Sequence, residues 1–518
     1  MGGKLIKYPI YTSVFLLFVL FIIAPVFYTL LFFEGSLVEN LKLLDQKTFY
    51  LLGKSILIAF TIASFATFFG TILGFLLYRT NLRFRNFYRM VLMIPLFISP
   101  YILAVAWKDL FFLFTGSSDW IASETGVILV LGIIFTPLSM LITGNAFNNI
   151  NTHLEETGLM ITDLQSVIFK IILPLIKPAL FTSFVLIFIF SISEFSVPSY
   201  FGVRLFTTEM FTQFSAFYNH SLAVLQSVLL ILICVVLLYA DRKYLADAPF
   251  LSFGGKGKKV KIFTLKKYRI PDELFVFFWF LISVLLPFSV LIIQSFKGGI
   301  SKFIQAFELL KPTFLSSVYL ALLGAAISVF IGFTAAYISE VRKIKIFDWF
   351  LLFVFAIPST IFGISLIKFY NHPFLDFIYS GFAIVIIAYV GKFSFIAAKL
   401  IGNAIKQIPQ SLEEAAQIEG VGFYRRIRKI VFPLVLPAVF TAFIINFTFS
   451  IGELGTTIMV YPPGSEIMPI KVFTIMANAP QSLVSAMTLI VLGVTLLLIT
   501  IMYLIVKPLL KNYSDANN

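Results

Sequence analysis

Long apolar stretches are the feature that most constrains how this chain can fold. A helix needs roughly 20 apolar residues to cross a bilayer, and about twelve such stretches occur among the 518 residues. They lie near residues 10–32, 52–78, 88–113, 126–148, 180–200, 222–240, 273–294, 314–339, 347–370, 381–404, 436–460 and 484–507. Hydrophobic residues make up 59% of the chain and charged residues only 12%, too few charges for a soluble surface. The predicted fold class is an all-α polytopic membrane protein of about twelve transmembrane helices.

The first apolar run and the single cysteine exclude two other readings of the chain. The run at 10–32 is too long for a removable signal peptide and lacks a small-residue cleavage site, so we expect a retained first span. Cys234 lies inside a predicted span. One cysteine can form neither a disulfide framework nor a thiolate metal cluster.

Positive charge gathers at particular connections between the spans. Basic residues in short loops mark the cytoplasmic side of a membrane protein. Here they precede span one and follow spans two, six and eight: Lys4, Lys7, Arg79, Arg83, Arg85, Arg89, Arg242, Lys243, Lys256, Lys258, Lys259, Lys261, Lys266, Lys267, Arg269, Arg342, Lys343 and Lys345. We therefore predict that both termini are cytoplasmic. Topology and anionic lipid headgroups account for the net charge of +14, so no nucleic-acid partner is expected.

The chain also repeats itself. Pro174, Pro178 and Glu194 recur 259 positions later as Pro433, Pro437 and Glu453, Gly70 corresponds to Gly332, and Ile94-Pro95 corresponds to Ile357-Pro358. Six spans in each half give both halves the same orientation. Such a parallel repeat predicts a pathway between the halves. The predicted domains are residues 1–240 and 273–518, joined by a basic cytoplasmic linker at 241–272.

Each half carries one polar segment between its apolar runs. Residues 412–437 read LEEAAQIEGVGFYRRIRKIVFPLVLP, and residues 154–178 read LEETGLMITDLQSVIFKIILPLIKP. In the second copy a short helix is expected to end at Gly420, and a basic turn then leads to Pro433. A short projecting helix with small residues on one face suits insertion into a groove on a partner.

These two segments resemble the signature of the inner-membrane permease subunits of binding-protein-dependent ABC importers. That signature is EAA, three residues, Gly, nine residues, Ile, one residue, Leu-Pro. The second half departs from it only at Phe432, whereas the first half has Thr157-Gly158 for Ala-Ala and no signature glycine. The resemblance implies ATPase-coupling loops that contain Glu155, Glu156, Pro174, Glu413, Glu414, Ala415, Ala416, Gly420, Ile430 and Pro433.

The resemblance further implies two cytoplasmic ATP-binding subunits, which would hold ATP and magnesium, and an extracytoplasmic substrate-binding protein. No cofactor is expected in this chain. The sequence agrees with an external motor, because Gly53-Lys54-Ser55 lacks the first glycine of a phosphate-binding loop and Phe393 follows Gly391-Lys392 where Ser or Thr is required.

Two strings are similar to the extracytoplasmic ends of ferric permeases, SEFSVPSYFG from Ser193 and GELGTTIMVYPPGSEIMPIKVFTIM from Gly452. They favour ferric iron, with thiamine, phosphonate or another small solute as alternatives. Glu194 and Glu453 end equivalent spans, where an ionisable side chain is costly and indicates a function. They could attract a hard cation through oxygen ligands or satisfy local helix ends. No definite metal site is predicted.

Two other classes were weighed. An ion-coupled secondary transporter also has two six-span halves, but it would need ionisable residues at mid-membrane and would lack duplicated docking loops. In this sequence the charges are expected at span ends, and both loops are present. A membrane-bound enzyme is disfavoured because the chain has three histidines and no catalytic constellation.

Overall fold

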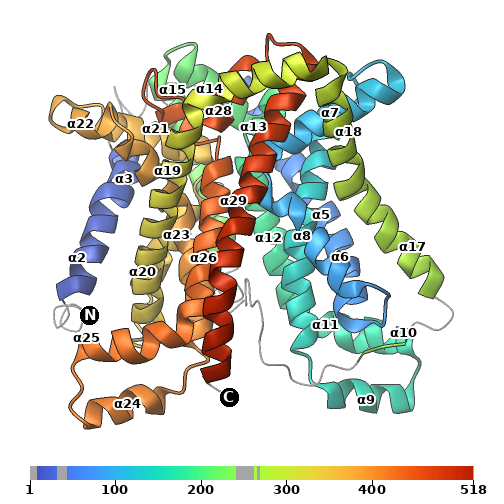
Figure 1. The fold of residues 1–518 in the computed structure, drawn as a ribbon, viewed down its shortest axis with the longest axis vertical. Coiled ribbons are helices and arrows are strands. Elements are labelled where there is room, and N and C mark those ends of the chain that lie inside the picture. The colour runs from blue at the N-terminus through green and yellow to red at the C-terminus, as the bar shows by residue number, and fades with distance from the viewer. Residues whose placement is uncertain (1–8, 32–43, 241–261, 265–268, 517–518) are drawn as a thin grey trace. The chain divides into compact units, whose positions relative to one another are not determined.

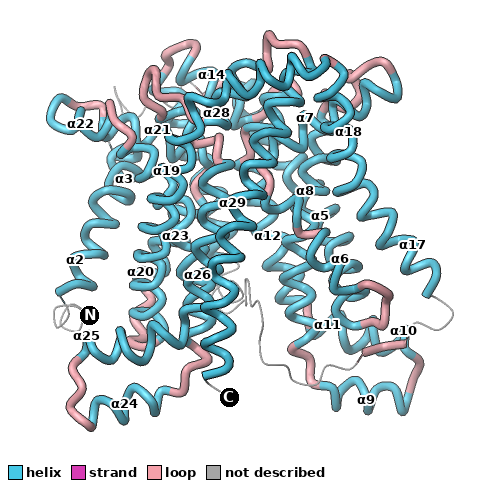
Figure 2. Tube along the Cα trace, in the orientation of Figure 1, coloured by secondary structure: helices cyan, strands magenta, loops and turns pink. Residues whose placement is uncertain are grey.

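The computed structural model describes residues 9–31, 44–240, 262–264 and 269–516. Its described part is built of helices, with a single isolated β-bridge between Thr80 and Phe263 (Figures 1 and 2). This confirms the predicted all-α fold class. The basic residues Lys4 and Lys7 and most of the predicted linker, residues 241–261 and 265–268, lie outside the described residues.

Among the described residues, nine helices are long and apolar enough to span a membrane, or up to 12 if three bent helix pairs each count as one span. The nine are Tyr11–Thr29, Gln46–Arg79, Glu124–Asn148, His220–Leu237, Arg269–Lys297, Gly299–Glu340, Ala383–Ile405, Phe423–Gly452 and Gln481–Ile505. The bent pairs are Arg85–Phe97 with Pro100–Thr115, Gln165–Leu175 with Lys177–Ser193, and Ile346–Ala356 with Ser359–Tyr370. All twelve coincide with predicted apolar stretches.

Two of the bent spans break at or near the duplicated Ile-Pro pairs: one at Ile357-Pro358, the other between Phe97 and Pro100, just after Ile94-Pro95. The first joins α6 (Arg85–Val91) and η2 (Ile94–Phe97) to α7 (Pro100–Thr115) at 101°, and the second joins α20 (Ile346–Ala356) to α21 (Ser359–Tyr370) at 105°. Proline cannot continue the helical hydrogen-bond ladder, and the residue before it avoids helical angles. Ile357 accordingly is extended, with ψ 128°. The expected straight spans at 88–113 and 347–370 are therefore each two helices.

Prolines at matching positions in the two halves also explain four π-helical turns. The turns η1 (Val19–Ile23), η3 (Ile168–Ile172), η5 (Leu281–Leu285) and η7 (Ile427–Val431) each end two residues before a proline. A proline has no N–H to donate to the carbonyl four residues earlier, so the preceding turn widens. Because η1 and η5, and likewise η3 and η7, occupy matching places in the two halves, the repeat extends to backbone detail.

The described chain forms two compact units, and each takes its first span from the other half of the sequence. Unit 2 comprises residues 34–303 and 480–488; unit 1 comprises residues 1–33, 304–479 and 489–518. In unit 1, Tyr370 Oη donates to the Phe21 carbonyl (2.8 Å). In unit 2, Trp279 stacks on Phe69 with ring centroids 4.7 Å apart. The division into 1–240 and 273–518 stays a prediction about the repeats, and the compact units cross it.

Unit 2 contains α5 (Gln46–Arg79), α6, η2, α7, α8 (Glu124–Asn148), α9 (Thr152–Ile161), α10 (Leu164–Val167), η3, α11 (Leu173–Leu175), α12 (Lys177–Ser193), α13 (Ser196–Tyr200), α14 (Phe206–Ser215), α15 (His220–Ala240), α17 (Arg269–Phe280), η5 and α18 (Leu286–Lys297). The helices α5 and α8 pack closely because Gly70 lies against α8. A Cβ atom at Gly70 would lie 2.5 Å from Ser139 Cβ.

Unit 1 contains α2 (Pro9–Phe18), η1, α3 (Ala24–Leu31), most of α19 (Gly299–Glu340), α20, α21, η6 (Pro373–Leu375), α22 (Asp376–Tyr379), α23 (Ala383–Ile405), α24 (Gln410–Ile418), α25 (Phe423–Arg426), η7, α26 (Phe432–Gly452), α27 (Thr457–Val460), α28 (Met468–Ile475) and most of α29 (Gln481–Ala516). Gly332 repeats the close approach of Gly70, since a Cβ there would lie 2.6 Å from Ala397 Cβ. The predicted correspondence of the two glycines thus has a packing cause.

In the described part of the linker, Phe263 packs on unit 2, while Ile262 and Thr264 on either side of it are exposed. Phe263 is buried and stacks on Phe75, with ring centroids 6.0 Å apart. Its N–H donates to the Arg79 carbonyl (2.7 Å) and its carbonyl accepts from Asn81 (3.2 Å). An aromatic ring gains free energy by leaving water, which explains why Phe263 docks on unit 2. The predicted linker also ends early, because α17 begins at Arg269.

Candidate coupling helices and pathway residues

The first docking segment forms α9, which is fastened to unit 2 by a buried ion pair. Glu155 is fully buried in the first turn of α9, and Arg79 ends α5 with 1% of its side chain exposed. Arg79 Nη2 donates to both carboxylate oxygens of Glu155, at 2.6 Å to Oε1, and Nη1 donates to the Phe147 carbonyl. The guanidinium also lies over the Phe263 ring, 5.4 Å from its centroid. A buried pair survives only with such additional hydrogen bonds.

The second docking segment forms α24, which is fastened to unit 1 through the corresponding glutamate. The Tyr337 hydroxyl on α19 donates to Glu413 Oε1, and Arg426 Nε lies 3.8 Å from the same oxygen. Glu413 retains 16% exposure of its side chain. The first glutamate of each LEE string therefore anchors its helix to the end of a long helix in the same unit. A neutral phenol replaces the buried guanidinium in the second repeat.

The remaining signature residues of the two helices face outward. Glu156 and Glu414 are exposed, Ala415 is exposed and Ala416 is half-buried. In unit 2, α9 lies at the end opposite α14, and in unit 1, α24 lies at the end opposite α28 (Figure 1). In each helix the first glutamate anchors the helix to its unit and the second glutamate faces solvent. One surface of each helix is therefore available to a partner. The residues Glu155, Glu156, Glu413, Glu414, Ala415 and Ala416 thus divide into anchors and exposed positions.

The two docking helices end differently. Gly420 adopts φ +73°, Val421 N–H donates to the Ala416 carbonyl (2.9 Å) and Gly420 N–H to that of Gln417 (3.1 Å), the pattern of a Schellman cap. The predicted turn at Gly420 is thereby explained, since a side chain is strained at that φ. In the first repeat α9 ends at Thr162 with φ −147°.

Asp163 then begins the next helix of the first segment. Its carboxylate accepts from the N–H of Gln165 (3.2 Å) and of Ser166 (3.4 Å). Hydrogen bonds from Ser166 lower the pKa of Asp163 below its usual value. The carboxylate is therefore ionised at neutral pH and suits a helix N-terminus. A side-chain cap here takes the place of the glycine turn in the second repeat.

The signature ends at the widened turns that lead into the membrane. Ile430 lies within η7, Pro433 follows it at the start of α26, and Pro174 stands in α11 directly after η3. Lys177–Ser193 bends away from the segment that ends at Leu175 by 62°. These residues shape the backbone between each docking helix and its following span.

Glu194 and Glu453 each end a span and hydrogen-bond the next short helix. Glu194 Oε1 accepts from the N–H of Ser196 (2.8 Å) and from its hydroxyl. The Glu453 carboxylate accepts from the N–H groups of Thr456 (2.6 Å) and Thr457 (2.9 Å). Both carboxylates are half-buried. These hydrogen bonds supply the local helix-end role weighed above, and a role in the pathway stays a prediction.

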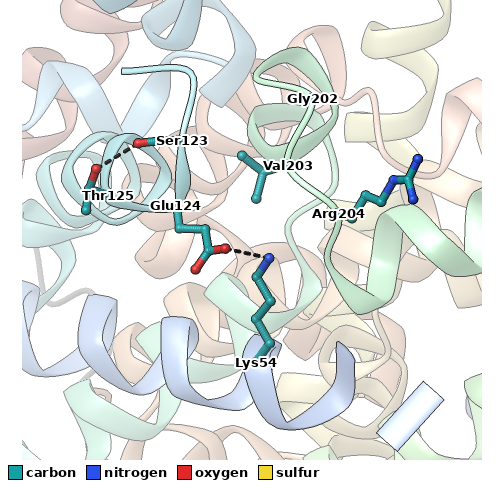
Figure 3. A pocket seen from close by; sticks show the side chains of 7 residues that line it. All are labelled: Lys54, Ser123, Glu124, Thr125, Gly202, Val203 and Arg204. Carbon is teal, nitrogen blue, oxygen red and sulfur yellow. Dashed lines mark hydrogen bonds and ion pairs between the residues drawn. The ribbon is translucent and has the colours of Figure 1, made fainter. Parts of the chain in front are cut away.

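The string Gly53-Lys54-Ser55, which has the tail of a phosphate loop, is a turn of the long helix α5. Lys54 Nζ lies 2.6 Å from Glu124 Oε1 beside a cavity of about 520 Å³ that Arg204 also lines (Figure 3). Ser55 Oγ accepts from the Phe206 N–H (2.8 Å), and Ser317 Oγ accepts from the Met468 N–H at the same distance. Lys54 and Ser55 therefore serve packing that recurs in both repeats.

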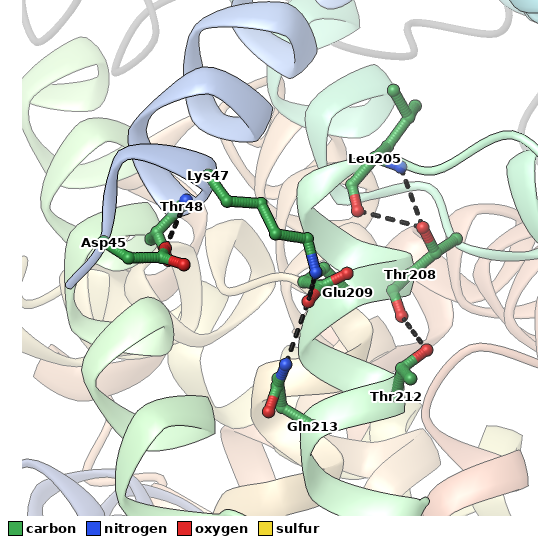
Figure 4. Close-up of polar contacts among 8 residues, drawn as sticks. All are labelled: Asp45, Lys47, Thr48, Leu205, Thr208, Glu209, Thr212 and Gln213. Atoms are coloured by element: carbon green, nitrogen blue, oxygen red, sulfur yellow. Dashed lines mark hydrogen bonds and ion pairs between the residues drawn. The ribbon is translucent and has the colours of Figure 1, made fainter. Parts of the chain in front are cut away.

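The ferric-like string after Ser193 continues into α14, which is tied to the start of α5 (Figure 4). Lys47 Nζ donates to Glu209 Oε1 (2.7 Å), and Gln213 Nε2 donates to the same oxygen (2.9 Å). Asp45 accepts from the Thr48 N–H (2.8 Å) and hydroxyl (2.7 Å), and these bonds lower its pKa. The acidic residue of Phe206-Thr207-Thr208-Glu209 is thus buried in a local polar network. In the described part of the chain no cluster of three His, Cys, Asp or Glu side chains could hold a metal ion.

The expectation that charges gather at span ends is wrong for Lys392, and a second ionisable residue, Asp109, is buried near the end of α7. Lys392 is buried midway along α23 and donates to the Ile357 carbonyl (2.7 Å) at the break between α20 and α21. Asp109 is fully buried in α7 and accepts from Gln481 and Ser485. A charge within a membrane span requires such partners. Lys392 therefore satisfies a carbonyl that the bend leaves without a helical partner.

Sequence reasoning missed Arg79 and Lys392 as structural residues. Its position after span two groups Arg79 with the basic loop residues that set topology. Lys392 belongs to the string Gly391-Lys392-Phe393, which lacks the Ser or Thr of a phosphate-binding loop. A lysine in the middle of a predicted span is itself a signal, because its burial without a partner would cost several kcal/mol. The partner, however, is a backbone carbonyl that no side-chain pattern reveals.

Up to 12 spans with an internal repeat define the class as a polytopic membrane protein with two related halves. The chain belongs to the family described as binding-protein-dependent transport system inner membrane component, which matches residues 66–247 and 328–511. The two matches confirm the internal repeat. The family implies the partners of an ABC transporter, a binding protein and an ATPase.

Curated relatives match most of the chain. It is 24% identical over 437 residues to Fe(3+)-transport system permease protein FbpB 2 of Haemophilus influenzae, covering 82% of this chain and 84% of the relative. It is 23% identical over 479 residues to ferric transport system permease protein FbpB of Actinobacillus pleuropneumoniae, covering 84% and 69%. A Salmonella paratyphi A permease named for a 2-aminoethylphosphonate transport system is 26% identical over 256 residues, covering 46% of this chain and 94% of the relative.

Proposed function

We propose that this chain is the transmembrane permease of an ATP-driven importer that carries ferric iron delivered by an extracytoplasmic binding protein. Both docking helices, α9 and α24, face the cytoplasm in this proposal, and both termini are cytoplasmic. Two ATPase subunits, which bind ATP and magnesium, hydrolyse ATP outside this chain. The permease itself performs no covalent chemistry.

The observation that carries the proposal is the duplicated anchoring of a short exposed helix. Glu155 holds α9 to the end of α5, and Glu413 holds α24 to the end of α19. A force applied to the exposed face of either helix would pass through the anchor into a long membrane span, because Glu155 bonds to the buried Arg79 and Glu413 bonds to the buried Tyr337. This arrangement suits a permease moved by an external motor.

Alternating access follows if the two ATPase subunits close on ATP and draw the two helices together. The bent spans at the Ile-Pro pairs and the widened turns before Pro174 and Pro433 provide places where the backbone already departs from a regular helix. Such points absorb changes of angle at low cost. The closed motor would favour the state that is open toward the binding protein.

Iron is favoured over the alternatives by the relatives and by the acidic residues at the span ends. The two relatives that cover most of the chain are named for Fe(3+) or ferric transport. Glu194 and Glu453 carry hard oxygen ligands of the kind that suit a trivalent cation. A proton- or ion-driven carrier remains the alternative of a different class, and the buried Lys392 and Asp109 are the residues it would invoke.

The substrate is tested by uptake in cells that lack their own ferric and phosphonate importers. The chain is expressed with the binding protein and ATPase encoded beside it, and uptake of labelled ferric iron is measured with and without excess 2-aminoethylphosphonate or thiamine. Iron uptake that neither competitor reduces is the expected result. Absence of iron uptake, with accumulation of one of the other solutes, would refute iron and retain the permease.

The second candidate substrate is 2-aminoethylphosphonate. It is favoured by the match to the Salmonella permease, which covers 94% of that relative but only 46% of this chain. Because this match covers only one repeat of the chain, it supports the permease architecture more strongly than it supports 2-aminoethylphosphonate as the solute. The same competition experiment decides between the two substrates.

A further inference from the structure

An apolar crevice on unit 2 has no part in the sites described above. Its volume is about 810 Å³. Its walls are α5 from Ser64 to Leu76, the segment from Ile168 to Leu180, and the first turns of α17. Three phenylalanines of the wall, Phe68, Phe75 and Phe184, belong to membrane spans, so the crevice lies where lipid surrounds the protein.

The crevice has the length of a single acyl chain. From Ser64 to Leu76 the helix α5 advances 76 − 64 = 12 residues, which at 1.5 Å per residue is about 18 Å. One leaflet of the hydrocarbon core is about 15 Å thick, half of the whole. Most of the wall is apolar: the Thr71 hydroxyl donates to the Thr67 carbonyl (2.6 Å), while the Thr67 hydroxyl is a buried polar atom without a hydrogen bond to any described residue. The dimensions and the surface thus both suit a lipid tail.

One end of the crevice carries an acidic side chain, Asp272, in the first turn of α17. The adjacent Glu273 accepts from Arg269 Nε (3.0 Å) and from the Arg83 N–H (3.3 Å). Asp272, in contrast, makes no hydrogen bond or ion pair with any residue that the structure describes. Its place at a helix N-terminus stabilises the charge in part. A carboxylate beside apolar surface still gains from a cationic partner.

We propose that this crevice binds one phospholipid of the leaflet adjoining α9, with an acyl chain along α5 and a headgroup ammonium, as in phosphatidylethanolamine, paired with Asp272. The lipid would lie against Phe147, whose carbonyl accepts from Arg79. It therefore also packs behind the anchor of α9. The proposal does not depend on which solute the permease carries.

Native mass spectrometry of the purified full chain tests the proposal. Phosphatidylethanolamine and phosphatidylglycerol with identical acyl chains are titrated separately, and bound lipid is counted. The wild type is expected to retain phosphatidylethanolamine about threefold better, the size of effect that one part-exposed ion pair gives. Asp272→Asn should abolish this preference. Asp119→Asn, which removes an exposed carboxylate on another loop, should keep it.

A second variant tests the tail site independently of charge. Leu180→Trp fills the apolar wall and should lower retention of both lipids without changing the preference for phosphatidylethanolamine among the lipid that still binds. The proposal is overturned if the wild type binds both lipids equally, if Asp272→Asn retains the preference, or if Leu180→Trp leaves binding of both lipids unchanged.

Discussion

Removal of the Glu155 carboxylate should release α9 far more than removal of the Glu413 carboxylate releases α24. In Glu155→Ala the Arg79 guanidinium, 1% exposed, stays buried without its carboxylate partner, although it still donates to the Phe147 carbonyl and lies over the Phe263 ring. Breaking a buried ion pair by removing one partner costs about 3–5 kcal/mol. Glu413→Ala removes a hydrogen bond from the neutral Tyr337 phenol and a 3.8 Å ion pair with Arg426, at a site where the carboxylate is 16% exposed. Arg426 keeps its hydrogen bond to the Val421 carbonyl (2.8 Å), so the change should cost about 1–2 kcal/mol.

Hydrogen exchange of the two docking helices measures both costs in the full chain. At about 1.4 kcal/mol per factor of ten, Glu155→Ala should lower the protection of the α9 amides roughly a hundredfold or more. Glu413→Ala should lower the protection of the α24 amides by about fivefold to thirtyfold. The double variant Arg79→Leu with Glu155→Leu removes both charges and should recover much of the protection of α9. Equal losses in the two single variants, or no recovery in the double variant, would refute the buried-pair reasoning.

Three further changes test the coupling turn, the topology and the pathway. Gly420→Val forces a β-branched residue to φ +73°, which costs roughly 1–2 kcal/mol. It should therefore impair transport and ATPase association more than Thr162→Val. Equal effects of the two variants would show that the glycine turn has no special role in coupling. In a chain whose native cysteine has been replaced, cysteines at Thr162 and Ser117 should react with membrane-impermeant reagents from opposite sides, Thr162 from the cytoplasm, and same-side reaction would exclude the twelve-span topology. If the Glu194 and Glu453 carboxylates admit the cation, the double variant Glu194→Gln with Glu453→Gln should reduce uptake per inserted transporter. Unchanged uptake, with stability lower by about 1 kcal/mol, would leave the two carboxylates only a local helix-end role.

Much of the fold followed from periodicity and composition. The twelve apolar stretches and the repeat, including the correspondence of the two Ile-Pro pairs, were predicted, because each can be read directly from the sequence. The bends near these pairs were not predicted. The exchange of first spans was not predicted. Nothing within Tyr11–Thr29 or Arg269–Lys297 specifies which half of the sequence it will pack against, since an apolar helix surface fits many others.

The candidate site was predicted as a segment more accurately than as a set of contacts. The docking segments and the turn at Gly420 followed from spacing and from the backbone freedom of glycine. The anchors did not, because Arg79 and Glu155 are 76 residues apart and no periodicity joins them. The first segment departs further from the signature, yet its glutamate is fully buried, whereas Glu413 is 16% exposed. The signature thus predicts which residues lie on the exposed face of the docking helix, but not which residues hold that helix to its unit.

The central claim, that an external ATPase drives this permease, is tested most directly in proteoliposomes. The chain is reconstituted with its ATPase and supplied with loaded binding protein outside, and uptake of labelled ferric iron is followed with ATP or without it inside, in the presence of a protonophore. The account predicts uptake that requires internal ATP and the ATPase subunit and that the protonophore does not reduce. Uptake by the chain alone, driven by an ion gradient and abolished by the protonophore, would contradict it.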